Sequence, residues 1–145
     1  MKSILTEENI LLNQTVNTKE EAIKLTGSVL VQNGYVNENY IEKMLEREEV
    51  STTYMGNGVA IPHGTEEGKK EVQASGISII QVPNGVEFGS GEPARILFGI
   101  AGKNDEHLEL LSKIAILCSD EENVARLVAA ETKEELMALF EEEVN

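Results

Sequence analysis

An almost unbroken apolar run at residues 96–101 constrains the fold of this chain more than any other segment. The run reads Ile-Leu-Phe-Gly-Ile-Ala and contains no polar side chain, so a strand formed here must be covered on both faces. Two further short apolar runs, at residues 59–61 and 76–81, lie among glycines and prolines, as strands do. We therefore expect a buried central sheet.

Helix signals precede these strands. Thr18 and Glu21 form a capping box before an apolar pattern of helical spacing, and Asn33-Gly34 ends this helix. A second helix is predicted from Asn37 to about residues 47–49. The apolar positions are Ala22, Ile23, Leu25, Val29 and Leu30 in the first helix, and Tyr40, Ile41, Met44 and Leu45 in the second.

Three more helices are predicted after the strands. Their capping signals are Asn104 or Asp105, Ser119 with Glu122, and Thr132 with Glu135. The apolar positions are Leu108, Leu111, Ile114, Ala115 and Cys118 in the first, Val124, Leu127 and Val128 in the second, and Leu136, Leu139 and Phe140 in the third. Residues 86–88 are predicted as a short edge strand, and residues 9–14 fit either a strand or a loop. Strands with helices before and after them favour an α/β fold with helices on both faces of the sheet.

Composition narrows the functional class. The chain has 145 residues, which predicts one domain spanning 1–145, and its 12 Lys+Arg against 26 Asp+Glu give a net charge of −14. This charge disfavours nucleic acid and anionic membranes as partners. No apolar run approaches the roughly 20 residues of a membrane helix, and the N-terminus has no signal-peptide pattern, so we expect a cytoplasmic protein without membrane insertion. The single cysteine, Cys118, allows no intramolecular disulfide and is assigned to packing.

His63 is the first candidate for chemistry. It directly follows the apolar run at residues 59–61 and stands between Pro62 and Gly64. Pro62 has a fixed φ and no N–H donor, and Gly64 leaves space beside the imidazole. We expect the ring to be presented at the end of a strand, where open α/β sheets bind their ligands.

A neutral imidazole nitrogen is a good nucleophile for a phosphoryl group once its other nitrogen donates to a fixed acceptor. His107, in the first turn of a predicted helix, is the candidate donor to the phosphoryl oxygens, and the helix dipole should keep it neutral. Arg47, at the end of the second helix, is the candidate phosphate partner.

Taken alone, His107 and Arg47 are explained better by structural roles than by functional ones. Pro62 and Gly64 also mark an ordinary turn, His107 fits a helix start, and Arg47 lies among Glu46, Glu48 and Glu49 as a solvated charge would. Two histidines without a third ligand make a weak metal site. From the residues alone, functional and structural roles for His63 are about equally favoured.

Two motifs resemble the fructose- and mannitol-type IIA domains of the bacterial phosphoenolpyruvate-dependent sugar phosphotransferase system. The first runs from Arg47-Glu48 through Ser51-Thr52 to the stretch 58–64, and the second is residues 104–108 followed by Leu111 and Ile114-Ala115. The resemblance extends from about Thr18 to Phe140. Residues 53–56, 62–65 and 85–89 are most similar to the mannitol-specific members.

The resemblance implies a fold, a role for each candidate and a set of partners. The fold is a three-layer α/β/α sandwich with a central mixed β-sheet. His63 would accept phosphate from the histidine phosphocarrier HPr and pass it to a IIB domain of a mannitol IICB permease on another chain. His107 would hold the phosphoryl group and Arg47 would stabilise it. No metal or organic cofactor is implied.

Two other functions remain open at this point. A regulatory module of the nitrogen or fructose type would accept phosphate without moving sugar, and it would not donate to a mannitol IIB domain. A hydrolase would use His63 as its nucleophile and release phosphate, although the sequence offers no obvious general acid.

Overall fold

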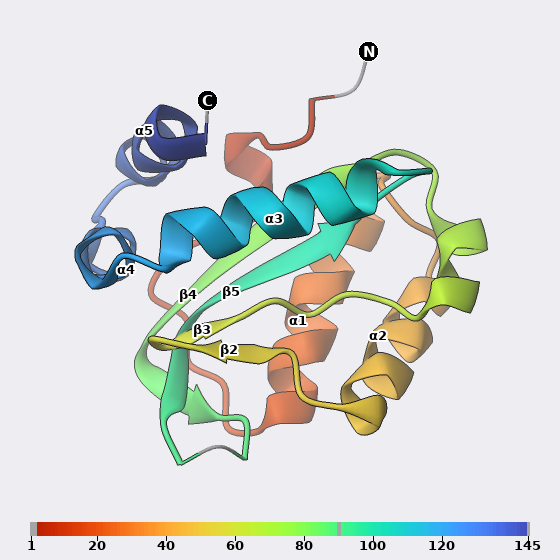
Figure 1. The fold of residues 1–145 in the computed structure, drawn as a ribbon, viewed down its shortest axis with the longest axis horizontal. Helices are drawn as coiled ribbons and strands as arrows, with labels where there is room; N and C mark the ends of the chain where they lie inside the picture. Colours follow the sequence, from red (N-terminus) through yellow and green to blue (C-terminus); the bar gives the residue numbers. More distant parts are fainter. Residues whose placement is uncertain (1–2, 90, 145) are drawn as a thin grey trace.

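The computed structural model describes residues 3–89 and 91–144 and is shown in Figure 1. At its centre is a five-stranded sheet in the order β1-β4-β5-β3-β2. The strands are β1 (Ile10–Leu11), β2 (Tyr54–Gly56), β3 (Val59–Ala60), β4 (Gly76–Glu87) and β5 (Pro93–Ala101). The β1–β4 and β3–β5 pairs are parallel, whereas the β2–β3 and β4–β5 pairs are antiparallel. The expected mixed sheet is confirmed.

Helices cover both faces of this sheet. They are α1 (Lys19–Gln32), α2 (Asn39–Val50), α3 (Glu106–Cys118), α4 (Glu121–Ala129) and α5 (Lys133–Val144). In Figure 1, α3 crosses in front of the sheet and α1 lies behind it. Among these helices of the described chain, none is long and apolar enough to cross a membrane.

β5 separates the two halves of the core. Residues 96–101 are all buried, as their composition predicts. Alternate residues Ile96, Phe98 and Ile100 pack with α3, α4 and α5, whereas Leu97 and Ala101 pack with α1 and α2. The three-layer α/β/α arrangement is therefore confirmed.

The first two helices begin and end close to where the sequence predicts. The Thr18 side chain accepts from the Glu21 N–H at 3.1 Å, and the Glu21 carboxylate accepts from the Asn17 N–H at 2.9 Å. The predicted start of α2 at Asn37 is two residues early. Asn37 lies just before the helix: its N–H donates to the Glu71 carbonyl at 2.8 Å, and its carbonyl accepts from the Tyr40 N–H at 3.0 Å.

The predicted apolar face of α3 is partly wrong. Leu108 is 70% exposed, and the buried residues are Leu110, Ile114, Leu117 and Cys118. Both sets have helical spacing, so periodicity alone does not determine which stripe faces the sheet.

Three local predictions also need correction or completion. α4 is capped by Asp120, whose carboxylate accepts from the Glu122 N–H at 2.9 Å, because the Ser119 hydroxyl donates back to Ile116 at the end of α3. Residues 86–88 do not form a separate edge strand: Val86 pairs with Ala94 as a continuation of β4. Within residues 9–14, the strand is limited to β1, and β2 was not predicted at all.

Gln81 is the polar residue that ties the sheet to the C-terminal helices. It is 2% exposed, and its side-chain N–H groups donate to the carbonyls of Leu127 and Ala130 at 3.1 and 2.9 Å. Its side-chain oxygen, Oε1, accepts from the Asn13 N–H at 2.9 Å. One buried side chain therefore satisfies the end of α4 and the segment after β1.

Gln81→Leu should lower the free energy of unfolding by roughly 2–4 kcal/mol, because it leaves buried backbone groups without partners. Urea denaturation followed by circular dichroism measures this loss. The matched control is Gln73→Leu at an exposed position, which should change stability by less than about 0.5 kcal/mol. Equal effects of the two variants would contradict the assigned role.

Candidate functional site

The site forms where the chain continues past β3 along the end of β5. His63 makes an isolated parallel bridge with Ile100, and the Ile100 N–H donates to the Pro62 carbonyl at 3.0 Å. This bridge places His63 beside the end of β5, from which the chain turns into α3. The predicted position at the end of a strand is thus the observed one.

His107 lies against His63. It is the second residue of α3, and the two ring centroids are 5.0 Å apart with an interplanar angle of 57°. Gly102 makes this approach possible, because a Cβ atom there would lie 2.3 Å from the His107 Cα. The two histidines are distant in sequence and meet only through this packing of α3 against the strand end.

A backbone carbonyl orients the His63 ring. The His63 Nδ1 lies 2.7 Å from the Ile61 oxygen. Because a carbonyl oxygen only accepts, the neutral ring carries its proton on Nδ1 and donates it to Ile61. The other nitrogen, Nε2, then has a free lone pair and is the potential nucleophile. Sequence reasoning did not identify this acceptor, because backbone carbonyls have no sequence signal.

Ile61 is held in place through Thr53 by the buried carboxylate of Glu48, for which the sequence predicted no role. The Ile61 N–H donates to the Thr53 carbonyl at 3.0 Å. The Thr53 N–H and hydroxyl both donate to Glu48, at 2.9 and 2.6 Å. The other Glu48 oxygen is 3.7 Å from the Lys19 ammonium group. The only available signal was the position of Glu48 beside Arg47 and before two threonines.

Arg47 acts on the histidine pair through its charge. It is half-buried in the last turn of α2, where its guanidinium group donates to the Ser51 carbonyl at 2.8 Å. Its charge lowers the pKa of both His63 and His107. The structure therefore brings His63 and His107 into contact, and Arg47 influences both by its charge while it is hydrogen-bonded to Ser51.

Both histidines are held in the neutral form at pH 7. Burial is the main cause that lowers the pKa of His107 to about 4, and the charges of His63 and Lys69 lower it further. Burial also lowers the pKa of His63, and the Ile61 carbonyl partly opposes this shift. We expected the helix dipole to keep His107 neutral, but burial is the larger cause. Lys69, in the short helix η2 (Glu66–Glu71), is a cation near the site that the sequence analysis missed.

Gly64 has a further role that the sequence does not indicate. A Cβ atom at this position would lie 2.6 Å from Cε1 of Tyr40, so glycine accommodates the tyrosine ring. His63 is also less open than expected, because it is 9% exposed.

Residues 3–143 match the protein family described as "Phosphoenolpyruvate-dependent sugar phosphotransferase system, EIIA 2". The chain belongs to this family. A mannitol-specific phosphotransferase enzyme IIA component from Bacillus subtilis (strain 168) is 64% identical over 139 residues, which cover 96% of this chain and 97% of that protein. The corresponding component from Geobacillus stearothermophilus is 58% identical over 139 residues, 96% of each chain.

Solved structures of the same family superimpose closely. One is a complex of enzyme IIA-mannitol with phosphorylated enzyme IIB-mannitol from Escherichia coli, determined by NMR. Its match has a TM-score of 0.90 and 38% identity, and covers 95% of this chain and 97% of that chain.

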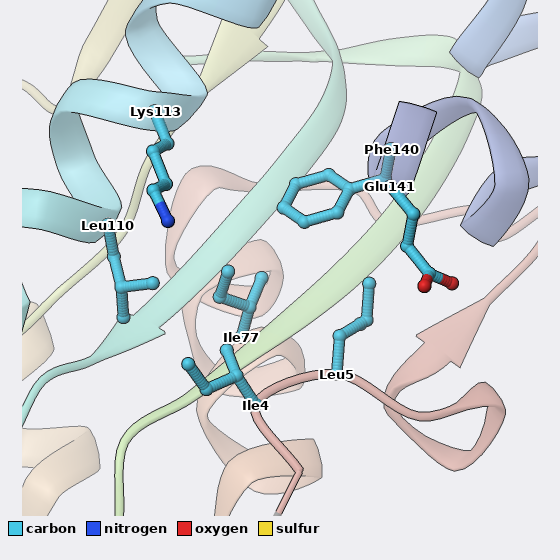
Figure 2. Close-up of a pocket in the computed structure, with 7 residues that line it drawn as sticks. All are labelled: Ile4, Leu5, Ile77, Leu110, Lys113, Phe140 and Glu141. Atoms are coloured by element: carbon cyan, nitrogen blue, oxygen red, sulfur yellow. The ribbon is translucent and has the colours of Figure 1, made fainter. Parts of the chain in front are cut away.

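A separate apolar pocket of about 190 Å³ lies between the N-terminal segment, β4, α3 and α5 (Figure 2). It is lined by Ile4, Leu5, Ile77, Leu110, Lys113, Phe140 and Glu141. None of the three candidate site residues lines it, so it lies outside this IIA-type site. Within the described part of the chain, no group of three or more His, Cys, Asp or Glu side chains is placed to hold a metal.

The histidine pair should make stability depend on pH. The folded pKa of His107, about 4, is below its ordinary value of 6.5, so the unfolded chain binds more protons between these values. The contribution of His107 to the free energy of unfolding is fully present above pH 6.5 and is lost as the pH falls towards 4. NMR titration of the ring protons should give a midpoint for His107 near 4.

His107→Gln is the control for this effect, because it removes one titrating group and leaves the carboxylates. Urea unfolding of this variant should lose less stability than the parent protein between pH 6.5 and 4. A midpoint for His107 near 6.5, with equal pH dependence of the two proteins, would contradict the assignment.

Proposed function

We propose that this chain is the IIA component of a mannitol phosphotransferase system, with one IIA domain spanning residues 1–145. It accepts a phosphoryl group from phospho-HPr on His63 and donates it to the IIB domain of a mannitol IICB permease in the cytoplasm. The observation that carries this proposal is the 2.7 Å contact between His63 Nδ1 and the Ile61 carbonyl. It leaves Nε2 as the nucleophile.

Phosphoryl transfer at this site needs few groups. The Nε2 lone pair forms a bond to phosphorus while the phosphorus–nitrogen bond of phospho-HPr breaks, so the electron pair of that bond returns to the donor histidine. The ring gains positive charge in this step, and the Ile61 carbonyl stabilises it through the retained Nδ1–H. His107 can donate to a phosphoryl oxygen, and the charge of Arg47 balances the negative charge. In the onward step, the thiolate of the acceptor cysteine of the IIB domain forms a bond to phosphorus while the phosphorus–Nε2 bond breaks, and the electron pair of that bond returns to the His63 ring.

The surface around the histidines fits a protein partner. Leu108, next to His107, is 70% exposed, and Val50, in the last turn of α2 with Arg47, is 77% exposed. Exposed apolar side chains beside a reactive group favour docking of another protein over binding of a small substrate. The net charge of −14 favours association with a basic surface on the donor.

Mannitol is proposed as the transported sugar because the relatives with the highest identities quoted above carry that specificity in their names. The same identities favour the transport role over the regulatory alternative, to which the fold is equally suited.

His63→Ala should abolish phosphate acceptance, because no other group takes the place of the Nε2 nucleophile. The assay incubates the protein with labelled phosphoenolpyruvate, enzyme I and HPr. Label on the parent protein should be lost in acid and survive in alkali, as a phosphohistidine does. His107→Ala should still accept label, about 100-fold more slowly, because it retains the His63 nucleophile and loses one hydrogen-bond donor. Label at a normal rate on His63→Ala would overturn the proposal.

Transfer to IIB separates the carrier from a regulator. The isolated phosphorylated protein should lose its label to a mannitol IIB domain within the assay time, and transfer should slow as salt rises because surface charges are screened. A IIB domain whose acceptor cysteine is replaced by serine is the control. Retention of label in the presence of the intact IIB domain would indicate a regulatory phosphoacceptor.

A further inference from the structure

Tyr40 links the segment around His63 to the central strand. It lies in the first turn of α2 and is 2% exposed. Its hydroxyl donates to the Ile100 carbonyl at 2.7 Å and accepts from the Gly64 N–H at 2.9 Å. One hydroxyl group therefore contacts the residue after His63 and the residue on β5 that His63 pairs with.

The bridge at His63 is held by two different contacts. On one side of it, the Ile100 N–H donates directly to the Pro62 carbonyl at 3.0 Å. On the other side, the Tyr40 hydroxyl lies between the Gly64 N–H and the Ile100 carbonyl. The distance between the two backbones after His63 is thus set by a side chain from α2.

The ring of Tyr40 also packs tightly against Gly64. A Cβ atom at Gly64 would lie 2.6 Å from Cε1 and 3.0 Å from Cζ of Tyr40. Burial raises the pKa of Tyr40 to about 12, so the hydroxyl keeps its proton at neutral pH. The donor and acceptor directions given above therefore hold under working conditions.

We propose that Tyr40 is a positioning residue for phosphoryl transfer: its hydroxyl holds residues 62–64 against β5 at the spacing that sets His63 against His107. The effect of Tyr40 on phosphoryl transfer rests on the proposed function, whereas its effect on the structure of the site does not. The sequence pattern assigned Tyr40 only to the apolar face of a helix, and its hydroxyl has no role in that assignment.

Tyr40→Phe tests the inference because it removes only the hydroxyl group. The matched control is Tyr35→Phe. Tyr35 is also 2% exposed, and its hydroxyl donates to the Ser3 carbonyl at 2.6 Å and accepts from the Asn9 side chain at 3.0 Å. Both variants should lower the urea midpoint, since each loses the hydroxyl hydrogen bonds named above.

Only Tyr40→Phe should alter the site. Its maximal rate of transfer from phospho-HPr should fall about 10-fold, with an unchanged KM for the donor, because the ring is misplaced while the docking surface is intact. Tyr35→Phe should transfer at the parent rate. Equal rates for the two variants, whether both normal or both reduced, would overturn the inference.

Two NMR measurements need no phosphoryl donor. In Tyr40→Phe, the Gly64 amide should exchange with solvent faster than in the parent, and the ¹⁵N shifts of the His63 ring should move. Unchanged values would overturn the structural part of the inference. Failure of the parent protein to accept phosphate would instead overturn the proposed function, so the two failures are distinguishable.

Gly64→Ala is a second variant in case Tyr40→Phe does not fold. It keeps the hydroxyl but pushes the tyrosine ring away from the 62–64 segment. It should show the same loss of maximal rate and the same shift of the His63 ring signals. A parent-like rate and spectrum in this variant would contradict the proposed role of Tyr40.

Discussion

The parallel pairing of β3 with β5, extended by the bridge between His63 and Ile100, is the contact on which the rest of the site depends. β5 is buried along residues 96–101 and separates the two packed layers of helices. Its end also leads into α3 through Gly102, so the same strand positions both histidines. A chemical site at this place inherits the rigidity of a strand whose last six residues are all buried.

The charged groups that act on the site are positive, whereas the net charge of the whole protein is negative. The net charge is −14, yet Arg47 and Lys69 both act on the pKa of His107. Burial keeps the two imidazoles neutral, which preserves a lone pair on His63 for attack. Local positive charge favours an incoming phosphoryl group, while the negative surface as a whole favours a basic protein partner. Positive charge near the reacting atoms therefore serves the phosphoryl group, and negative charge over the rest of the surface serves the protein partner.

Much of the fold could be predicted because each layer has a local signal. The capping box at Thr18 predicts the start of α1, and the apolar run at residues 96–101 predicts a buried strand; both are present in the structure. Two of the errors occur where two local patterns are equally good. Leu108 and Leu110 both lie on stripes of helical spacing in α3, and Ser119 and Asp120 are both capping residue types. Packing against the sheet decided which stripe of α3 is buried, whereas hydrogen bonds within the connection from α3 to α4 decided the cap.

By itself, the sequence determined that strands lie between capped helices, that a histidine follows a strand between proline and glycine, and that Arg47 and His107 are its candidate partners. Only the tertiary structure decided that His63 and His107 meet at 5.0 Å, that the Ile61 carbonyl selects the reactive nitrogen, and that Glu48 and Tyr40 brace the segment around it. The physical reason is that these contacts join residues far apart in the chain, or use backbone atoms that every residue carries. Propensity and periodicity report only on neighbours along the sequence, whereas the geometry of a site depends on how separate elements pack.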